Sequence, residues 1–263
     1  MSVPNPKPPS DLAQRAIVGV GLVVLALGAL WAGRIAFWLL AIVAALFMMA
    51  EWSDLDDASV RFKRLAQYGL SVPLAIMAPV ASGPSFFALG LLAGAAFFVA
   101  AVTRRGRLGW GIAYVGLPVL ALLWIRAQEN GLALALWTLS IVWATDIGAY
   151  FAGRAIGGPK LAPRISPSKT WAGLAGGVVS AGLVGWALGE AAQLPLRLVV
   201  AAPLLAVLAQ GGDLYESWLK RRAGVKDSGN ILPGHGGILD RLDGVVPVAP
   251  MAALLLLWPT LAG

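Results

Sequence analysis

Nine apolar runs separated by short polar segments dominate the sequence and restrict what it can fold into. They are Ile17–Trp31, Ile35–Ala50, Tyr68–Ser82, Ser85–Val102, Leu108–Ile125, Leu132–Ala152, Thr170–Leu188, Leu196–Gln210 and Val245–Leu261. A perpendicular transmembrane helix needs about 20 apolar residues, and it satisfies its own backbone hydrogen bonds within the lipid. Several runs are shorter than this, and Pro or Gly interrupts some. The pattern predicts an all-α polytopic membrane protein, a helical bundle of about nine transmembrane helices.

Composition supports a membrane protein and excludes cysteine chemistry. Charged residues make up 13% of the chain and hydrophobic residues 59%, whereas soluble domains average about 25% charged. Without cysteine there is no disulfide framework and no thiolate metal site. The first run has the length of a signal-peptide core. Another apolar run follows it almost at once, after Arg34, which favours an uncleaved helix.

The distribution of Lys and Arg predicts the orientation. If the N-terminus is inside, 17 of the 20 cations lie in cytoplasmic segments, and only Arg34, Arg126 and Arg197 lie outside. This is the positive-inside pattern. It predicts a protein of the inner (plasma) membrane with its N-terminus inside, its C-terminus outside and a cytosol-facing polar site. Cytoplasmic loops and an anionic substrate then account for the net charge of +7, so no nucleic-acid partner is predicted. Tryptophans near the run ends are expected to be interfacial anchors: Trp31, Trp52, Trp110, Trp171 and Trp258.

Three regions follow from this organisation. Residues 1–15 are Pro-rich and polar and are predicted to be a disordered cytosolic tail, and residues 16–130 form an N-terminal transmembrane region. Residues 131–263 form a C-terminal catalytic transmembrane region. It contains two polar cytoplasmic segments, Asp146–Gly173 and Gln210–Asp243.

The carboxylates of these two segments are candidate metal ligands. Asp146 and Asp213 lie at the cytoplasmic ends of apolar helices, where an ionised group is costly unless it is paired. Asp240 and Asp243 are three residues apart, so on a helix they would point the same way. Converging carboxylates suit Mg²⁺, which combines a few carboxylates with substrate phosphates. The alternative is that they pair with cations such as Lys220 and only close the bundle.

Cations and glycines accompany the carboxylates. The cations are Lys220, Arg221, Lys226 and Arg241, joined by Arg164 and Lys169 if the two segments meet. A mixed-sign cluster fits a metal–polyphosphate site, although Lys220–Arg222 also fits an ordinary cluster that ends a span. The glycines of "PGHGG" would let backbone N–H groups approach an anion. His235 has no second histidine or cysteine with which to bind a transition metal, so it donates to a phosphate, assists a leaving group or holds the loop. The "SPSKT" stretch has the alternative role of a helix cap before Trp171.

These residues together resemble a known family signature. From Ser217 to Asp243 the pattern S-x-x-K-R-x(4)-K-D-S-G-x-x-x-P-G-H-G-G-x-x-D-R-x-D is similar, without a gap, to that of phosphatidate cytidylyltransferases (CDP-diglyceride synthetases). A second stretch, D-x-x-A-Y-x-x-G-R followed by S-P-x-K-T-W, also resembles the family. Two positions depart from it: Ala172 stands where the family often has Glu, and Ser168 where Lys is common. The resemblance is close only in the C-terminal half.

The resemblance implies transfer of the cytidylyl group of CTP to phosphatidic acid, giving CDP-diacylglycerol and pyrophosphate for phospholipid biosynthesis. It also implies Mg²⁺, with or without a second cation, and a homodimer surrounded by membrane lipids. Metal ligands would be Asp213, Asp240 and Asp243, with Asp146. Lys220, Arg221 and Lys226 would bind the triphosphate or the departing pyrophosphate. Lys169, Arg164 and Ser166 would bind the lipid phosphate, and Arg241 and Ser217 would complete the substrate site. The catalytic set is then Asp213, Lys220, Asp240, Asp243 and His235.

Two other functions share some of these features. A membrane lipid kinase or another nucleotidyl transferase would use the same polyphosphate chemistry but transfer a different group. A transporter would favour ionisable groups at mid-span rather than at helix ends. The D-G-x(2)-A-R run of CDP-alcohol phosphotransferases does not occur in the sequence.

Overall fold

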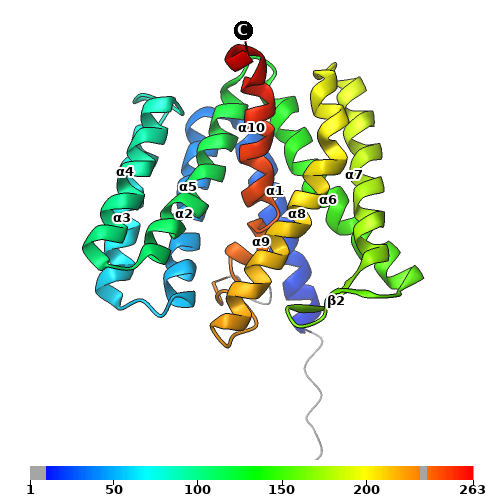
Figure 1. The fold of residues 1–263 in the computed structure, drawn as a ribbon. Helices are drawn as coiled ribbons and strands as arrows, with labels where there is room; N and C mark the ends of the chain where they lie inside the picture. Colours follow the sequence, from blue (N-terminus) through cyan, green and yellow to red (C-terminus); the bar gives the residue numbers. More distant parts are fainter. Residues whose placement is uncertain (1–9, 232–235, 263) are drawn as a thin grey trace, which may run out of the picture.

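A computed structural model describes residues 10–231 and 236–262, and helices make up most of them (Figure 1). The long helices are α1 (Ser10–Ala32), α2 (Arg34–Leu55), α3 (Val60–Ile76), α4 (Phe86–Thr103), α5 (Gly106–Ala127), α6 (Gly131–Ile156), α7 (Trp171–Ala191), α8 (Leu196–Arg222) and α10 (Val245–Ala262), and α9 (Leu239–Leu242) is a single turn. Each apolar run overlaps one long helix, so the predicted helical bundle is confirmed. Among the described residues, six helices are long and apolar enough to cross a membrane. Nine spans therefore stay a prediction.

Helix boundaries differ from the apolar runs where side chains decide them. α3 begins at Val60, within a charged stretch, because the Ser59 hydroxyl caps it by accepting from Phe62 N. α8 continues beyond Gln210 to Arg222, with three cations in its last turn, where they complement the helix dipole. α1 begins at Ser10, inside the stretch predicted to be a tail, and residues 1–9 lie outside the described part.

A two-stranded antiparallel hairpin, which the all-α prediction did not include, joins α6 to α7. Strand β1 (Lys160–Ala162) pairs with β2 (Ser166–Thr170), with Lys160 opposite Thr170 and Ala162 opposite Ser166. Prolines at 159, 163 and 167 prevent a continuous helix here, because proline lacks the backbone donor that a helix interior needs. The hairpin lies at the same end of the bundle as α9 (Figure 1).

Small residues bring α6 and α7 into close contact. A methyl group added at Gly176 would lie 2.2 Å from the Ala152 Cβ, and one at Gly148 would lie 2.2 Å from the Ser180 hydroxyl oxygen. Glycine at such positions lets two helix backbones approach, which is the usual means of helix association within a membrane. This packing places the C-terminal half of α6 beside the start of α7.

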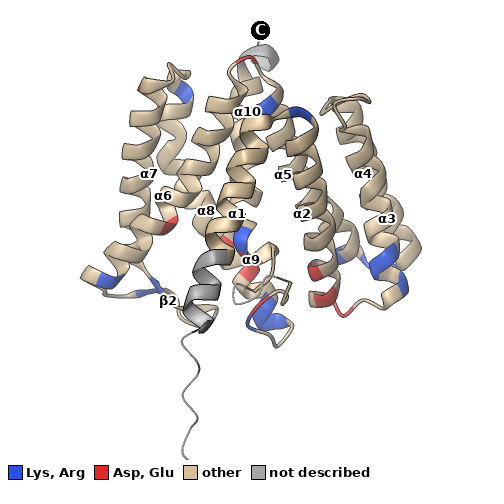
Figure 2. Cartoon of the chain, turned by 180° about the vertical axis from the view of Figure 1, so that it is seen from behind, with Lys and Arg blue, Asp and Glu red and all other residues tan. Residues whose placement is uncertain are grey.

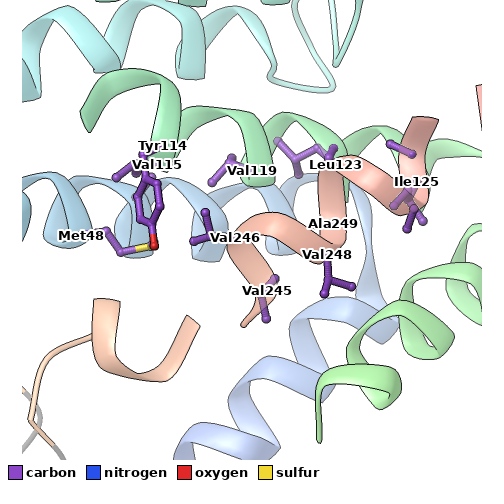
Figure 3. Packing of buried hydrophobic residues seen from close by; sticks show 14 of the residues in the cluster. Met48, Tyr114, Val115, Val119, Leu123, Ile125, Val245, Val246, Val248 and Ala249 are labelled. Atoms are coloured by element: carbon purple, nitrogen blue, oxygen red, sulfur yellow. The ribbon is translucent and has the colours of Figure 1, made fainter. Parts of the chain in front are cut away.

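Part of the bundle core lies between α2, α5 and α10. Figure 3 shows Val246 and Ala249 of α10 against the α5 residues Val119 and Leu123. Trp52 of α2 also belongs to this core: it is 2% exposed and its indole nitrogen donates to Arg107 O at 2.9 Å. The prediction of Trp52 as an interfacial anchor is therefore wrong, because this face of α2 packs against α5.

Charged side chains gather at one end of the bundle. Figure 2 shows most Lys, Arg, Asp and Glu residues at the end where α9 and β2 lie, and few at the opposite end. Both predicted polar segments contribute to the charged end. The structure thus brings the cation-rich segments to one side, as the charge pattern predicted.

Candidate active site at the charged end of the bundle

The two polar segments meet, which the sequence had left open. The Lys169 ammonium, at the end of β2, lies 2.5 Å from a carboxylate oxygen of Asp213 on α8. It also donates to the Gln210 side-chain oxygen at 3.0 Å. Further along α8, the Arg221 guanidinium donates to Ile165 O in the hairpin at 3.4 Å. Residues more than 40 positions apart in the sequence thus form one polar site.

A cavity of about 460 Å³ opens where these segments meet. Its polar lining includes Asp146, Tyr150, Arg154, Lys169, Thr170 and Asp213. The first three lie four residues apart on α6 and so share one helix face. The Arg154 guanidinium donates to the Tyr150 hydroxyl at 3.1 Å. Thr170 caps α7, because its hydroxyl accepts from Gly173 N at 3.0 Å, which confirms the capping role considered for this stretch.

One face of α8 carries the acidic and basic groups of the site. Asp213, Glu216, Ser217 and Lys220 follow the spacing of neighbours on a helix surface. The Ser217 hydroxyl donates to Asp213 at 3.3 Å. The Lys220 ammonium lies 2.5 Å from Asp240 and 3.5 Å from Glu216. Lys220, predicted to bind substrate, is thus paired with two carboxylates in this structure.

Asp240 is surrounded by donors from the protein. One carboxylate oxygen accepts from Lys220, and the other accepts from Ser228 N, Ser228 Oγ and Gly237 N at 2.8–3.0 Å. Burial alone would raise the pKa of Asp240, but these hydrogen bonds, led by that from Lys220, lower it below its ordinary value. Both oxygens therefore hold the loop and α8 together, and a metal-binding role for Asp240 stays a prediction.

Asp243, at the end of α9, lies close to α8. A methyl group at Gly212 would lie 2.3 Å from Asp243 O, so only glycine allows this approach. Burial, followed by the negative charge of Asp213, raises the pKa of Asp243 to about 7. Asp146 raises it further. Burial and the negative charges of the two other aspartates thus both disfavour the ionised form of Asp243.

The donor set fits Mg²⁺ only in a mode that also uses substrate oxygens. Within residues 10–231 and 236–262, no group of three or more His, Asp or Glu side chains is arranged to hold a metal ion by itself. Mg²⁺ in nucleotide enzymes is commonly bound by one or two carboxylates together with phosphate oxygens. Asp146 and Asp213 line the same cavity and supply such a pair.

Four further predicted residues are not part of the cavity lining. Ser166 is part of β2, Arg164 is exposed at the hairpin turn, and Lys226 is exposed on the loop after α8. Arg241 is exposed on α9. His235 lies outside the described residues, so its predicted role is unchanged.

Comparison with known proteins shows the family to which this chain belongs. The model of the cytidylyltransferase family matches residues 13–258. The chain is 39% identical over 252 residues to the phosphatidate cytidylyltransferase of Brucella suis, covering 93% of both proteins. It is 38% identical over 275 residues to that of Pseudomonas aeruginosa, covering 93% of this chain and 97% of the relative. The chain belongs to the cytidylyltransferase family.

Two buried carboxylates of this cytidylyltransferase-family chain were missed by the sequence reasoning. Glu216 is fully buried, and no described donor forms a hydrogen bond with either of its oxygens. Glu51 of α2 is 2% exposed and reaches the loop between α8 and α9. Each is an ionisable group within or near a membrane helix, which is by itself a signal of a functional role. For Glu51 the signal lay outside both polar segments and was overlooked.

Proposed function

We propose that the chain transfers the cytidylyl group of CTP to phosphatidic acid, giving CDP-diacylglycerol and pyrophosphate. The observation that carries the proposal is the convergence of Asp146, Lys169 and Asp213, from three sequence-distant elements, in one cavity at the charged end. The relatives that match over nearly the whole chain are phosphatidate cytidylyltransferases. A site with both carboxylates and cations suits a reaction between two anionic substrates.

The reaction needs alignment and charge neutralisation more than a strong base. An oxygen of the lipid phosphate monoester is already anionic near neutral pH. It attacks the α-phosphorus of CTP, a new P–O bond forms, and the bond from the α-phosphorus to the bridging oxygen breaks as pyrophosphate leaves. Holding both anions in line supplies the main rate enhancement.

The cations divide between the two substrates. Lys169 and Arg154 in the cavity lining, with Arg164 and Ser166 of the hairpin, would bind the lipid phosphate. Arg221, Lys226 and Arg241 would bind the triphosphate, and Ser217 orients Asp213 through its hydroxyl. Lys220, which is paired with Asp240, would contribute positive charge to the triphosphate site.

Asp146 and Asp213 would hold Mg²⁺, with Asp243 close by. The metal would neutralise charge that develops on the phosphate oxygens. Asp240 would position the loop that carries Lys226.

The nucleotide and the product provide the direct test. Purified protein would receive CTP, ATP, GTP or UTP with phosphatidic acid and Mg²⁺, and both lipid products and pyrophosphate would be measured. We expect CDP-diacylglycerol and one equivalent of pyrophosphate with CTP. Phosphorylated lipid and free nucleoside diphosphate would instead indicate a lipid kinase. Family membership favours nucleotidyl transfer, and the position of the charges at one end argues against transport.

Replacing Lys226 with Met should raise the KM for CTP. The side chain is exposed on the loop and removal of one phosphate contact weakens binding, so an increase of about 5- to 20-fold is expected, equivalent to a charge-assisted hydrogen bond. The melting temperature in detergent should not change. Steady-state kinetics with varied CTP provides the measurement. An unchanged KM would indicate that Lys226 does not bind CTP and serves only as a positive charge that sets the membrane topology.

We also propose that the charged end faces the cytosol, with nine spans in the inner membrane and a homodimer as the assembly. Cysteine introduced at Gly106 or Gln193, both exposed, tests the orientation in this cysteine-free chain. Position 193 should react with an impermeant thiol reagent added to intact cells, and position 106 should react only after lysis. The opposite pattern would reverse the orientation and place the site outside.

A further inference from the structure

Glu51 connects the N-terminal helices to the signature loop. It lies on α2, 177 residues before Ser228, and is 2% exposed. One carboxylate oxygen accepts from Ile238 N at 2.9 Å. The other accepts from Leu239 N at 2.8 Å and from the Ser228 hydroxyl at 3.0 Å. All three donors belong to the loop between α8 and α9 or to the start of α9.

These contacts meet a need of the loop backbone. The first N–H groups of a helical turn have no partner within it, and a buried N–H without a partner is costly. An ionised carboxylate only accepts hydrogen bonds, and its bonds to such donors are stronger than those between neutral groups. Glu51 therefore supplies the acceptors that the start of α9 lacks.

Asp240 also holds this loop. It accepts from Ser228 N and Gly237 N and pairs with Lys220 on α8. Ser228 is the shared residue, because its hydroxyl lies 3.0 Å from both carboxylates. Hydrogen bonds to Glu51 on α2 and to Asp240 on α9 thus hold the loop in place. Asp243 follows Asp240 by three residues.

The loop backbone lies directly against Glu51. A methyl group at Gly229 would lie 2.8 Å from one Glu51 oxygen, and its next nearest neighbours would also be Glu51 atoms. Gly229 has no positive φ, so alanine fits its backbone conformation and only the contact with Glu51 opposes it. This gives a way to disturb the contact without changing Glu51.

We propose that Glu51 is a positioning residue that fixes the loop and thereby the placement of Lys226, Asp240 and Asp243 for nucleotidyl transfer, a role that rests on the function proposed above. Its action is through the loop backbone. Glu51 therefore affects turnover without contacting either substrate. The mobility of the loop is a readout of this role that does not depend on activity.

The experiment uses the absence of native cysteine. A spin label on Ile231→Cys, an exposed loop position, reports loop mobility by electron paramagnetic resonance, with the full-length protein in detergent or nanodiscs. Glu51→Gln keeps the size of the side chain but turns an amide NH₂ toward one set of donors. We expect a more mobile label and a kcat lowered about 10- to 100-fold, as for other supporting groups of a site. Asp54→Asn is the matched control, since this exposed carboxylate lies on the same helix and pairs with Lys63 at 2.6 Å; it should change neither reading.

Gly229→Ala is the second variant and keeps the test decisive if Glu51→Gln does not fold. It should mobilise the same label and lower kcat, because its methyl group displaces the Glu51 carboxylate. The proposal is overturned if folded Glu51→Gln or, failing that, Gly229→Ala leaves the label and kcat unchanged. If wild-type protein forms no CDP-diacylglycerol yet Glu51→Gln still mobilises the label, the positioning role stands and the proposed function fails.

Discussion

Asp213→Asn should lower kcat for CDP-diacylglycerol formation by about 10²- to 10³-fold, the usual cost of removing one preorganised electrostatic group from a reaction centre. Asn keeps the shape of the side chain and can still accept from the Ser217 hydroxyl, but it removes the charge that would hold Mg²⁺ beside Asp146. The Asp213 side chain is 31% exposed, so the melting temperature should stay near that of the wild type. Activity measured against Mg²⁺ concentration, together with melting in detergent, provides the readout.

Lys169→Met is the matched control for this prediction, because it removes the ion-pair partner of Asp213 and leaves the carboxylate. It should raise the KM for the lipid while the Mg²⁺ concentration for half-maximal activity stays unchanged. A folded Asp213→Asn protein with normal turnover and a normal Mg²⁺ requirement would refute the metal-binding assignment of Asp213.

Asp240→Asn should have the largest effect on stability. Lys220 and Asp240 form a largely buried ion pair, with side chains 14% and 7% exposed, and breaking such a pair by removing one partner costs about 3–5 kcal/mol. The new amide would also turn an NH₂ group toward donors such as Gly237 N. A fall in melting temperature on the order of 10 °C is expected, with loss of activity as the loop detaches.

Two measurements distinguish an anchor from a metal ligand at this position. If Asp240 anchors the loop, melting temperature falls and the surviving activity keeps its Mg²⁺ requirement; a raised requirement with unchanged melting would make it a ligand. The difference in stability between wild type and variant should also depend on pH. Since the folded pKa of Asp240 is lowered, its contribution is fully present above the ordinary value of about 4 and is lost as pH falls through the folded pKa.

Much of the bundle could be predicted because its constraints are local. A backbone in lipid must satisfy its own hydrogen bonds, so an apolar run such as Leu108–Ile125 has to become helical, and it does so in α5. The position of each Lys and Arg relative to the apolar runs can also be read from the sequence. The positive-inside pattern then predicts that the two cation-rich segments lie at the same end. The hairpin was not predicted, because its pairing of Lys160 with Thr170 depends on strand partners and not on a periodic pattern.

The sequence by itself determined the helical bundle, the position of the charged end and the residues from which a polyphosphate site could be built. Only the tertiary structure decided their partners: Lys169 with Asp213, Lys220 with Asp240, and Glu51 with the backbone of a loop 177 residues away. The reason is physical. Helix formation depends on neighbours within a few residues, whereas the partner of a buried charge depends on which helix faces pack together, and side chains distributed along the whole bundle decide that packing.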